Sequence, residues 1–348
     1  MSPYVLAIFP LTLLLGTYLV FHSSHWLIMW MGLEMNTLAI IPLMAQQHHP
    51  RAVEATTKYF LTQATASAVL LFACTINAWE TGNWSVLYMQ DPIAINMAIM
   101  AIALKMGLAP VHFWLPEVLQ GISLTTGLIL STWQKLAPFI VLLNITKESY
   151  PPLLMVLAVL SVIVGGWGGL NQTQVRKILA YSSIAHLGWM ILVIHMAPKM
   201  AIMAMLVYIT MTTATFLTLK KTNATNIATL TLGWTKAPAL TALACLALLS
   251  LGGLPPLTGF LPKWYILQEV TTQGFLLIAT VVALGALLSL YFYLRLTYAM
   301  TLTLSPHPSI SSTPWRKTKK HQTLLLATAT IMATCLLPIA PTIFSMIS

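Results

Sequence analysis

Long apolar runs separated by short polar stretches occupy almost the whole chain. Eleven of these runs approach the roughly 20 residues that an α-helix needs to cross the hydrocarbon core of a bilayer. They cover residues 3–21, 25–45, 57–79, 92–121, 123–146, 151–171, 174–196, 199–219, 237–271, 274–304 and 322–346. The pattern predicts an all-α polytopic membrane protein with 11 transmembrane helices.

The fourth and ninth apolar segments contain the same interruption. Residues 107–116 and 253–262 both fit the pattern G-L-x-P-x(4)-L-P, and the second copy follows the first by 146 residues. The residues that break the helix are Gly107, Pro110 and Pro116 in the first copy, and Gly253, Pro256 and Pro262 in the second. In hydrocarbon, backbone groups freed by a break need protein partners or a wet cavity.

Matched breaks in two halves of a membrane protein favour a transport site, with a pair of packing kinks as the alternative. We expect carbonyls near each break to contact water or the ammonium of Lys105 or Lys263. The breaks divide the chain into a five-helix repeat over 1–147, a second five-helix repeat over 148–304, and a basic loop with a C-terminal helix over 305–348. Because five is odd, the second repeat is predicted to be inverted relative to the first.

Composition excludes a soluble globular domain. The 348 residues are 58% hydrophobic and 7% charged, and the mean hydropathy is +0.82. The three cysteines have no CxxC spacing, so neither a disulfide framework nor a metal site is indicated. The net charge of +10 could suggest nucleic acid, but the basic residues are scattered in loops. We therefore expect no nucleic-acid partner.

The basic loop residues are concentrated on one side of the predicted membrane. The side that holds the N-terminus has eleven: Arg51, Lys58, Arg176, Lys177, Lys220, Lys221, Lys236, Arg316, Lys317, Lys319 and Lys320. The opposite side has only Lys147 and Lys199. By the positive-inside rule, the N-terminus faces the cytoplasm or matrix and the C-terminus faces the opposite compartment. The loop before the last helix could also lie along anionic lipid head groups.

Four basic residues remain inside the predicted spans, namely Lys105, Lys135, Lys263 and Arg295, and Glu34 is the only acid near the middle of one. Ionisable groups at the bilayer centre cost at least about 2.5–3.5 kcal/mol each, so they rarely persist without a partner or a task. One carboxylate cannot pair three lysines. Burial disfavours a charged lysine and a nearby carboxylate favours it, so a lysine balanced between the two can exchange protons.

These charges predict a proton relay through Glu34, Lys105, Lys135 and Lys263. His186, with Ser182 and Ser183 one turn away, is a further candidate. The structural alternative is a Glu34–Lys105 ion pair that fixes helix packing, with the other two lysines snorkelling to an interface. Snorkelling suits Lys135 poorly, because it lies at the centre of segment 123–146. Arg295 is expected to snorkel.

Four stretches carry a resemblance to a known family: residues 30–36 (WMGLEMN), 104–117 (LKMGLAPVHFWLPE), 177–188 (KILAYSSIAHLG) and 253–263 (GLPPLTGFLPK). They resemble the antiporter-like membrane subunits of respiratory complex I, NADH:ubiquinone oxidoreductase, which are related to cation/proton antiporters of the Mrp type. The resemblance covers essentially the whole chain and implies two inverted five-helix bundles, each with a broken helix. Bacterial members carry three further N-terminal helices, and this chain resembles the shorter animal form.

By this resemblance, Glu34 is an acidic switch, Lys105 its partner, Lys135 the central proton-carrying lysine and Lys263 the terminal basic group of the second bundle. The family implies no redox cofactor on this chain: NADH, FMN, iron–sulfur clusters and ubiquinone are bound by other subunits. The implied partners are a neighbouring antiporter-like subunit, other membrane-arm core subunits, accessory subunits and lipids such as cardiolipin. The implied location is the mitochondrial inner membrane.

Two other functions remain open at this point. A stand-alone Na⁺/H⁺ antiporter would favour additional oxygen ligands, whereas the sequence offers one carboxylate in mid-membrane. A purely structural membrane subunit is the third possibility. Purification in detergent separates them, since a subunit leaves the membrane with a large complex and an antiporter works as a monomer.

Overall fold

The computed structural model describes the chain except for residues 1–2, 47–48, 147–151, 302–322, 340–341 and 343–348. The described residues form helices joined by turns and loops. Two isolated β-bridges occur among them, and they contain no β-strand. Each of the eleven predicted segments contains helix. Arg316, Lys317, Lys319 and Lys320 of the basic loop lie outside the described residues, as does the expected repeat boundary at 147–148.

Five helical spans in the described part of the chain are long and apolar enough to cross a membrane: Trp26–Met44, Pro50–Thr81, Leu124–Ile145, Pro198–Thr222 and Leu276–Thr301. Five further apolar helices are shorter, with 10–17 residues each. The chain is therefore a multi-pass membrane protein. The count of eleven transmembrane helices stays a prediction.

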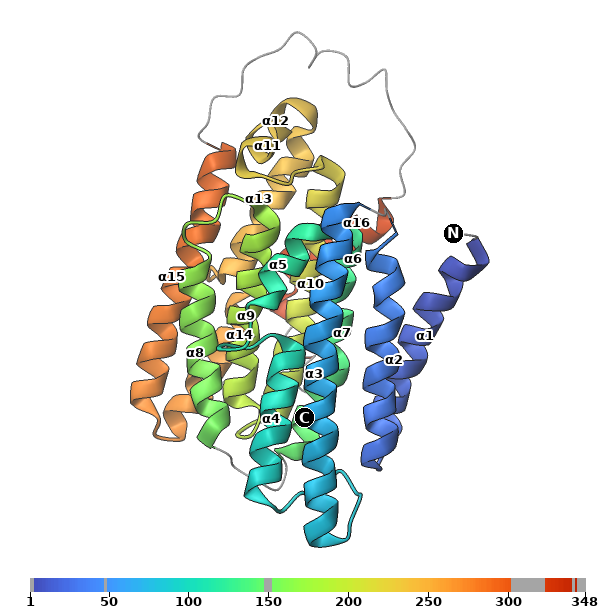
Figure 1. Cartoon of the computed structure of the whole chain (residues 1–348). Helices are drawn as coiled ribbons and strands as arrows, with labels where there is room; N and C mark the ends of the chain where they lie inside the picture. The colour runs from blue at the N-terminus through green and yellow to red at the C-terminus, as the bar shows by residue number, and fades with distance from the viewer. Residues whose placement is uncertain (1–2, 47–48, 147–151, 302–322, 340–341, 343–348) are drawn as a thin grey trace. The chain divides into compact units, whose positions relative to one another are not determined.

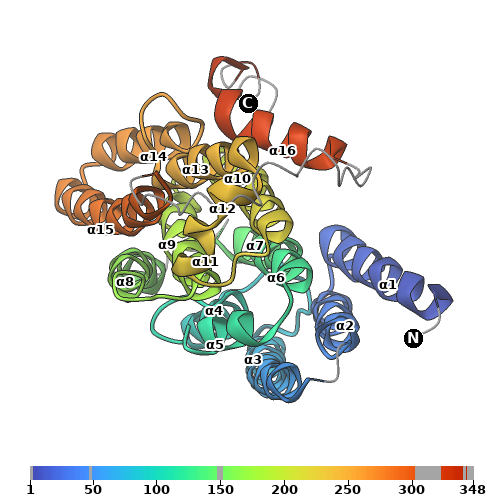
Figure 2. The same cartoon turned by 90° about the horizontal axis from the view of Figure 1, so that it is seen from above.

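The chain divides into two compact units, residues 1–161 with 194–198, and residues 162–193 with 199–348. Unit 1 contains α1 (Pro3–His22), α2 (Trp26–Met44), α3 (Pro50–Thr81), α4 (Pro92–Met106), α5 (Trp114–Gly121), α6 (Leu124–Ser131) and α7 (Trp133–Ile145). In it, α2 packs between α1 and α3, while α3 also packs against α4 and α5 (Figures 1 and 2). Helix α7 packs against α1, α2, α4 and α6, which places it in the interior of the unit.

Helix α8 (Pro152–Gly168) contains the boundary between the units. Unit 2 contains α9 (Val175–Val193), α10 (Pro198–Thr222), α11 (Ile227–Thr231), α12 (Gly233–Lys236), α13 (Pro238–Gly252), α14 (Phe260–Thr272), α15 (Leu276–Thr301), α16 (Leu324–Cys335) and the short 3₁₀ helix η3 (Leu337–Ile339). Helix α15 packs against α9, α11, α13 and α14, and α16 packs against α13 (Figure 2).

Helices α4 and α13 end in the same way, at the glycine of the repeated motif. Each has 15 residues with Pro in its first turn, and each stops before a left-handed glycine: Gly107 (φ 78°, ψ 45°) and Gly253 (φ 79°, ψ 44°). In each case the amides of this glycine and of the next leucine both bond to one carbonyl, that of Ala103 or Leu249. This cap requires positive φ, which glycine adopts without a Cβ clash. The chain returns to helix at Trp114 and Phe260, again 146 residues apart.

The predicted segment 123–146 is one helical span, Leu124–Ile145, with an interruption that the sequence did not predict at the single residue Thr132, between α6 and α7. The Thr132 hydroxyl donates to the Leu128 carbonyl at 2.7 Å, a local bond that bends helices. Pro138 lies in the next turns and has no N–H for the Gln134 carbonyl. Lys135 is thus the third residue of α7 and lies near the middle of the span Leu124–Ile145, just after this interruption.

Candidate functional site

Lys105 and Glu34 form a buried ion pair inside unit 1. Lys105 lies in the last turn of α4, and its Nζ donates to Glu34 Oε1, in the middle of α2, at 3.2 Å. The lysine side chain is 1% exposed and the carboxylate 23%. The second carboxylate oxygen accepts a hydrogen bond from the Thr37 hydroxyl at 3.4 Å. The pair predicted from the sequence is therefore present, and its acidic partner is the more accessible of the two.

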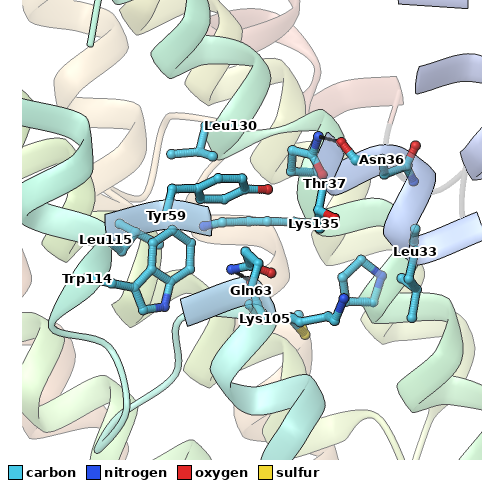
Figure 3. A pocket seen from close by; sticks show the side chains of 14 residues that line it. Leu33, Asn36, Thr37, Tyr59, Gln63, Lys105, Trp114, Leu115, Leu130 and Lys135 are labelled. Atoms are coloured by element: carbon cyan, nitrogen blue, oxygen red, sulfur yellow. Dashed lines mark hydrogen bonds between the residues drawn. The ribbon is translucent and has the colours of Figure 1, made fainter. Parts of the chain in front are cut away.

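A small internal cavity adjoins this pair and brings a second lysine to it. The cavity has about 20 Å³ of space for the centres of water molecules, which is roughly enough for one water. Lys105 and Lys135 both line it, together with Tyr59 and Gln63 of α3 (Figure 3). Lys135 is 3% exposed, so its ammonium lies inside the unit and does not snorkel. Lys105 and Lys135 thus line one space in unit 1, and Glu34 is joined to it through its ion pair with Lys105.

Neutral groups satisfy the backbone released by the first break. The Ala109 amide donates to Ser161 Oγ of α8 at 3.1 Å, and Trp114 Nε1 donates to the Leu104 carbonyl at 3.0 Å. The amide of Gln63 donates to the Lys105 carbonyl at 3.5 Å, the long limit of a hydrogen bond. Pro110 lies within the turn and Pro116 in the first turn of α5, where a missing N–H leaves no helix bond unmade. The Lys105 ammonium is therefore left for Glu34 and the cavity.

In unit 2 the ammonium of Lys263 closes the second break directly. Lys263 is the fourth residue of α14 and 9% exposed, and its Nζ donates to the Gly252 carbonyl at 2.9 Å. A Cβ added to Gly253 would lie 2.9 Å from that Nζ. Pro256 lies in the turn between the helices and Pro262 in the first turn of α14. Lys263 thus makes the carbonyl contact expected near a break, and it does not snorkel.

His186 lies beside Lys263 in unit 2. Both line a group that also includes Trp189, Ser289 and Tyr293. The side chains of this group leave about 0 Å³ of space for the centre of a water molecule. The His186 ring also tilts against Tyr208 of α10, with centroids 5.6 Å apart. The predicted site residues therefore form two groups, one in each unit.

The fourth basic residue of the predicted spans has a backbone partner. Arg295 of α15 is partly buried and donates from Nη1 to the Leu170 carbonyl at 2.6 Å. The guanidinium of Arg295 thus has a backbone partner two residues after the end of α8, and its snorkelling stays a prediction.

Sequence reasoning missed the neutral polar residues around the lysines. Tyr59 and Gln63 lie one helical turn apart on α3 and are 2% and 3% exposed. Gln134 of α7 lines the same cavity and donates to the Asn36 carbonyl at 2.9 Å. The sequence contains a signal for Gln63 and Gln134, since an amide inside an apolar segment is uncommon.

The chemistry that these groups offer is proton exchange. The two sites present ammonium, carboxylate, imidazole and hydroxyl groups, all of which bind or release protons. In the described part of the chain, no three His, Cys, Asp or Glu residues gather as they would around a metal ion. Cys74, Cys245 and Cys335 are free thiols.

Comparison with known proteins places the chain in a family. Residues 23–289 match the family described as NADH:quinone oxidoreductase/Mrp antiporter, and residues 290–344 match the C-terminus of NADH dehydrogenase subunit 2. The chain is 62% identical over 346 residues to NADH-ubiquinone oxidoreductase chain 2 of Carassius auratus, with 99% of both chains covered. The chain belongs to the family of NADH-ubiquinone oxidoreductase chain 2. The same-named protein of Oncorhynchus mykiss is 60% identical, with 100% of both chains covered.

Solved structures agree with this family assignment. A chain of respiratory complex I from Thermus thermophilus with bound aureothin matches with a TM-score of 0.86 and 27% identity, covering 99% of this chain and 80% of that one. A chain of the Mrp complex from Dietzia sp. matches with a TM-score of 0.82 and 15% identity, covering 97% and 76%. The second likeness is one of fold alone. The resemblance recognised in the four sequence stretches is confirmed.

Proposed function

We propose that this chain is a core membrane-arm subunit of respiratory complex I, which moves protons across the mitochondrial inner membrane while electrons pass from NADH to ubiquinone. One observation carries this proposal: Lys105, which forms an ion pair with Glu34, and Lys135 line the same internal cavity. An ion pair built only for packing needs no such space and no second buried ammonium. The family to which the chain belongs supports respiratory complex I as the complex in which this proton chemistry takes place.

The relay works through the accessible partner of the ion pair. When Glu34 lies against Lys105, it stabilises the charged form of the lysine, and when it moves away burial favours the neutral form. Releasing the pair lets the Lys105 proton pass across the cavity to Lys135. In unit 2, Lys263 and His186 form the corresponding terminal group. Because these groups interact, their titrations belong to the set and not to single residues.

The membrane architecture is two inverted five-helix repeats over 1–147 and 148–304, followed by the basic loop and C-terminal helix of 305–348. Helix bounds support it: α2 and α9 each have 19 residues and start 149 residues apart, while α4 and α13 each have 15 and start 146 apart. In this arrangement the chain crosses the membrane eleven times. The excess of basic loop residues in the sequence supports an N-terminus in the matrix and a C-terminus in the intermembrane space.

The redox chemistry takes place on other subunits, which bind NADH, FMN, the iron–sulfur clusters and ubiquinone. This chain responds to quinone reduction electrostatically and by conformational change. Its partners are the other membrane-arm core subunits, including a neighbouring antiporter-like subunit, accessory subunits, and membrane lipids such as cardiolipin. A stand-alone Na⁺/H⁺ antiporter would need more oxygen ligands than Glu34 supplies, and the detergent purification described above tests that alternative.

Replacing Lys135 with Met tests the proposal. Met keeps a flexible apolar stem but deletes the proton site, so the complex should assemble while proton pumping falls by about two orders of magnitude or more. Lys221→Met, at an exposed position on α10, is the matched control and should leave pumping unchanged. Protons pumped per NADH oxidised is measured on assembled complex in liposomes. Normal pumping in assembled Lys135→Met complex would overturn the proposal.

A further inference from the structure

Two of the polar side chains that line the cavity of unit 1, Tyr59 and Gln63, come from helix α3. Tyr59 is 2% exposed and lines the cavity, yet no hydrogen bond of its hydroxyl is found within the described part of the chain. Its ring is held against Trp114, with centroids 5.7 Å apart and planes inclined at 60°. A hydroxyl held at a cavity without a protein partner can be satisfied by a water molecule in that cavity.

Gln63 also has a side-chain atom without a hydrogen bond to the described residues. Its amide nitrogen donates to the Lys105 carbonyl, while its amide oxygen accepts no hydrogen bond from the described residues. That oxygen can accept two hydrogen bonds. Because Tyr59 and Gln63 are four residues apart on α3, they present their polar ends on one helix face.

We infer that Tyr59 and Gln63 are positioning residues, which hold one water molecule in the cavity between Lys105 and Lys135. The space is sufficient for about one water, and the polar partners that such a water needs are present. The water donates one hydrogen to the Gln63 amide oxygen and accepts one from the Tyr59 hydroxyl. Its remaining donor and acceptor are directed at the two lysines.

This arrangement sets the path of the proton. The charged lysine gives its N–H proton to the water oxygen, and the water gives a different proton to the nitrogen of the neutral lysine. One positive charge moves from one lysine to the other, and the water is restored. Tyr59 and Gln63 exchange no proton in this step. They orient the water so that both transfers occur along existing hydrogen bonds.

The inference rests on the proposed relay, and the variants Tyr59→Phe and Gln63→Leu test it separately. Each removes one hydrogen bond to the water while keeping a side chain of similar size. Turnover per assembled complex should fall about fivefold, the factor that corresponds to one hydrogen bond, with the KM values for NADH and ubiquinone unchanged. Tyr18→Phe, at an exposed tyrosine on α1, is the matched control.

A second measurement keeps the inference falsifiable if a variant fails to assemble. A high-resolution map of the native complex should show one water within hydrogen-bond distance of the Tyr59 hydroxyl and the Gln63 amide oxygen, and the Gln63→Leu map should show it displaced. A dry cavity, or a water that contacts neither side chain, would overturn the inference. If Lys135→Met abolishes pumping while Tyr59→Phe and Gln63→Leu leave turnover unchanged, the inference fails and the proposed function stands.

Discussion

The helices before the two breaks end in nearly the same glycine cap, but the breaks have different charges. Gly107 and Gly253 differ by only about one degree in each backbone angle, and both cap a helix of 15 residues. In unit 1 the lysine precedes the break, and Leu251 occupies the matching position in unit 2. In unit 2 the lysine follows the break, and Glu117 occupies the matching position in unit 1. The motif therefore determines where the helix stops, and other residues determine which charge is placed there.

The partners of the two lysines differ in the same sense. Lys105 is bound to the side chain of Glu34, which is partly exposed and can move or change its charge. Lys263 is bound to the Gly252 carbonyl, a fixed backbone dipole that cannot titrate. Lys105 also adjoins a cavity with room for about one water, whereas the group around Lys263 leaves no room for a water. The ion pair at the first break can thus form and separate, whereas the second break holds an ammonium in place.

Among the changes that compare the two breaks, the largest effect is expected from removing the ammonium of Lys263. Lys263→Met deletes a proton site and leaves the Gly252 carbonyl without its donor, so pumping by assembled complex should fall by about two orders of magnitude. Assembly should fall as well, because an unsatisfied buried carbonyl costs about 1–3 kcal/mol. Pumping and the yield of complex are measured together, with Lys221→Met as control. Full pumping by assembled Lys263→Met complex would show that Lys263 only caps the Gly252 carbonyl and carries no proton.

A smaller effect should distinguish the two glycines. Alanine in the left-handed region costs about 1–2 kcal/mol at either position, so Gly107→Ala and Gly253→Ala should reduce assembly equally. The new Cβ would meet Leu115 Cδ1 at 2.8 Å in the first case and Lys263 Nζ at 2.9 Å in the second. Only the Cβ of Gly253→Ala would displace a proton-relay group, the ammonium of Lys263. Turnover per assembled complex should therefore fall several-fold further in Gly253→Ala than in Gly107→Ala. Equal turnover in the two variants would contradict this.

The smallest effect is expected at Glu117, which occupies the motif position of Lys263. Its carboxylate is 54% exposed and pairs with Lys58 at 2.7 Å, and exposed ion pairs contribute little to stability. Glu117→Gln should therefore leave assembly and pumping unchanged within error. A loss of pumping similar to that of Lys263→Met would show that this motif position has the same role in both units, and would remove the contrast between the breaks.

Much of this contrast was predictable from the sequence, for identifiable reasons. The repeated Gly and Pro positions predict both helix ends, because few residues tolerate positive φ or a missing N–H in a helix. The Glu34–Lys105 contact spans 71 residues in sequence. It could be predicted because Glu34 is the only acid near the middle of a predicted span.

Other features depend on local or neutral interactions that the pattern of charges does not contain. The interruption at Thr132 follows from a side-chain bond to a carbonyl one turn away, which many threonines make without breaking a helix. The contact of Lys263 with Gly252 depends on how the chain turns back after the break. The places of Tyr59 and Gln63 depend on the packing of α3 against α4 and α5.

A double-mutant cycle on Glu34 and Lys105 tests the account most directly. Glu34→Gln removes the carboxylate that stabilises the charged lysine, and Lys105→Ala removes the lysine itself. If the two residues form one switch, each change alone should lower pumping by about tenfold or more, and the double variant should be close to the worse single variant, because residues that act as a unit are non-additive. The readout is protons pumped per NADH oxidised by assembled complex. Losses that multiply independently would contradict the account.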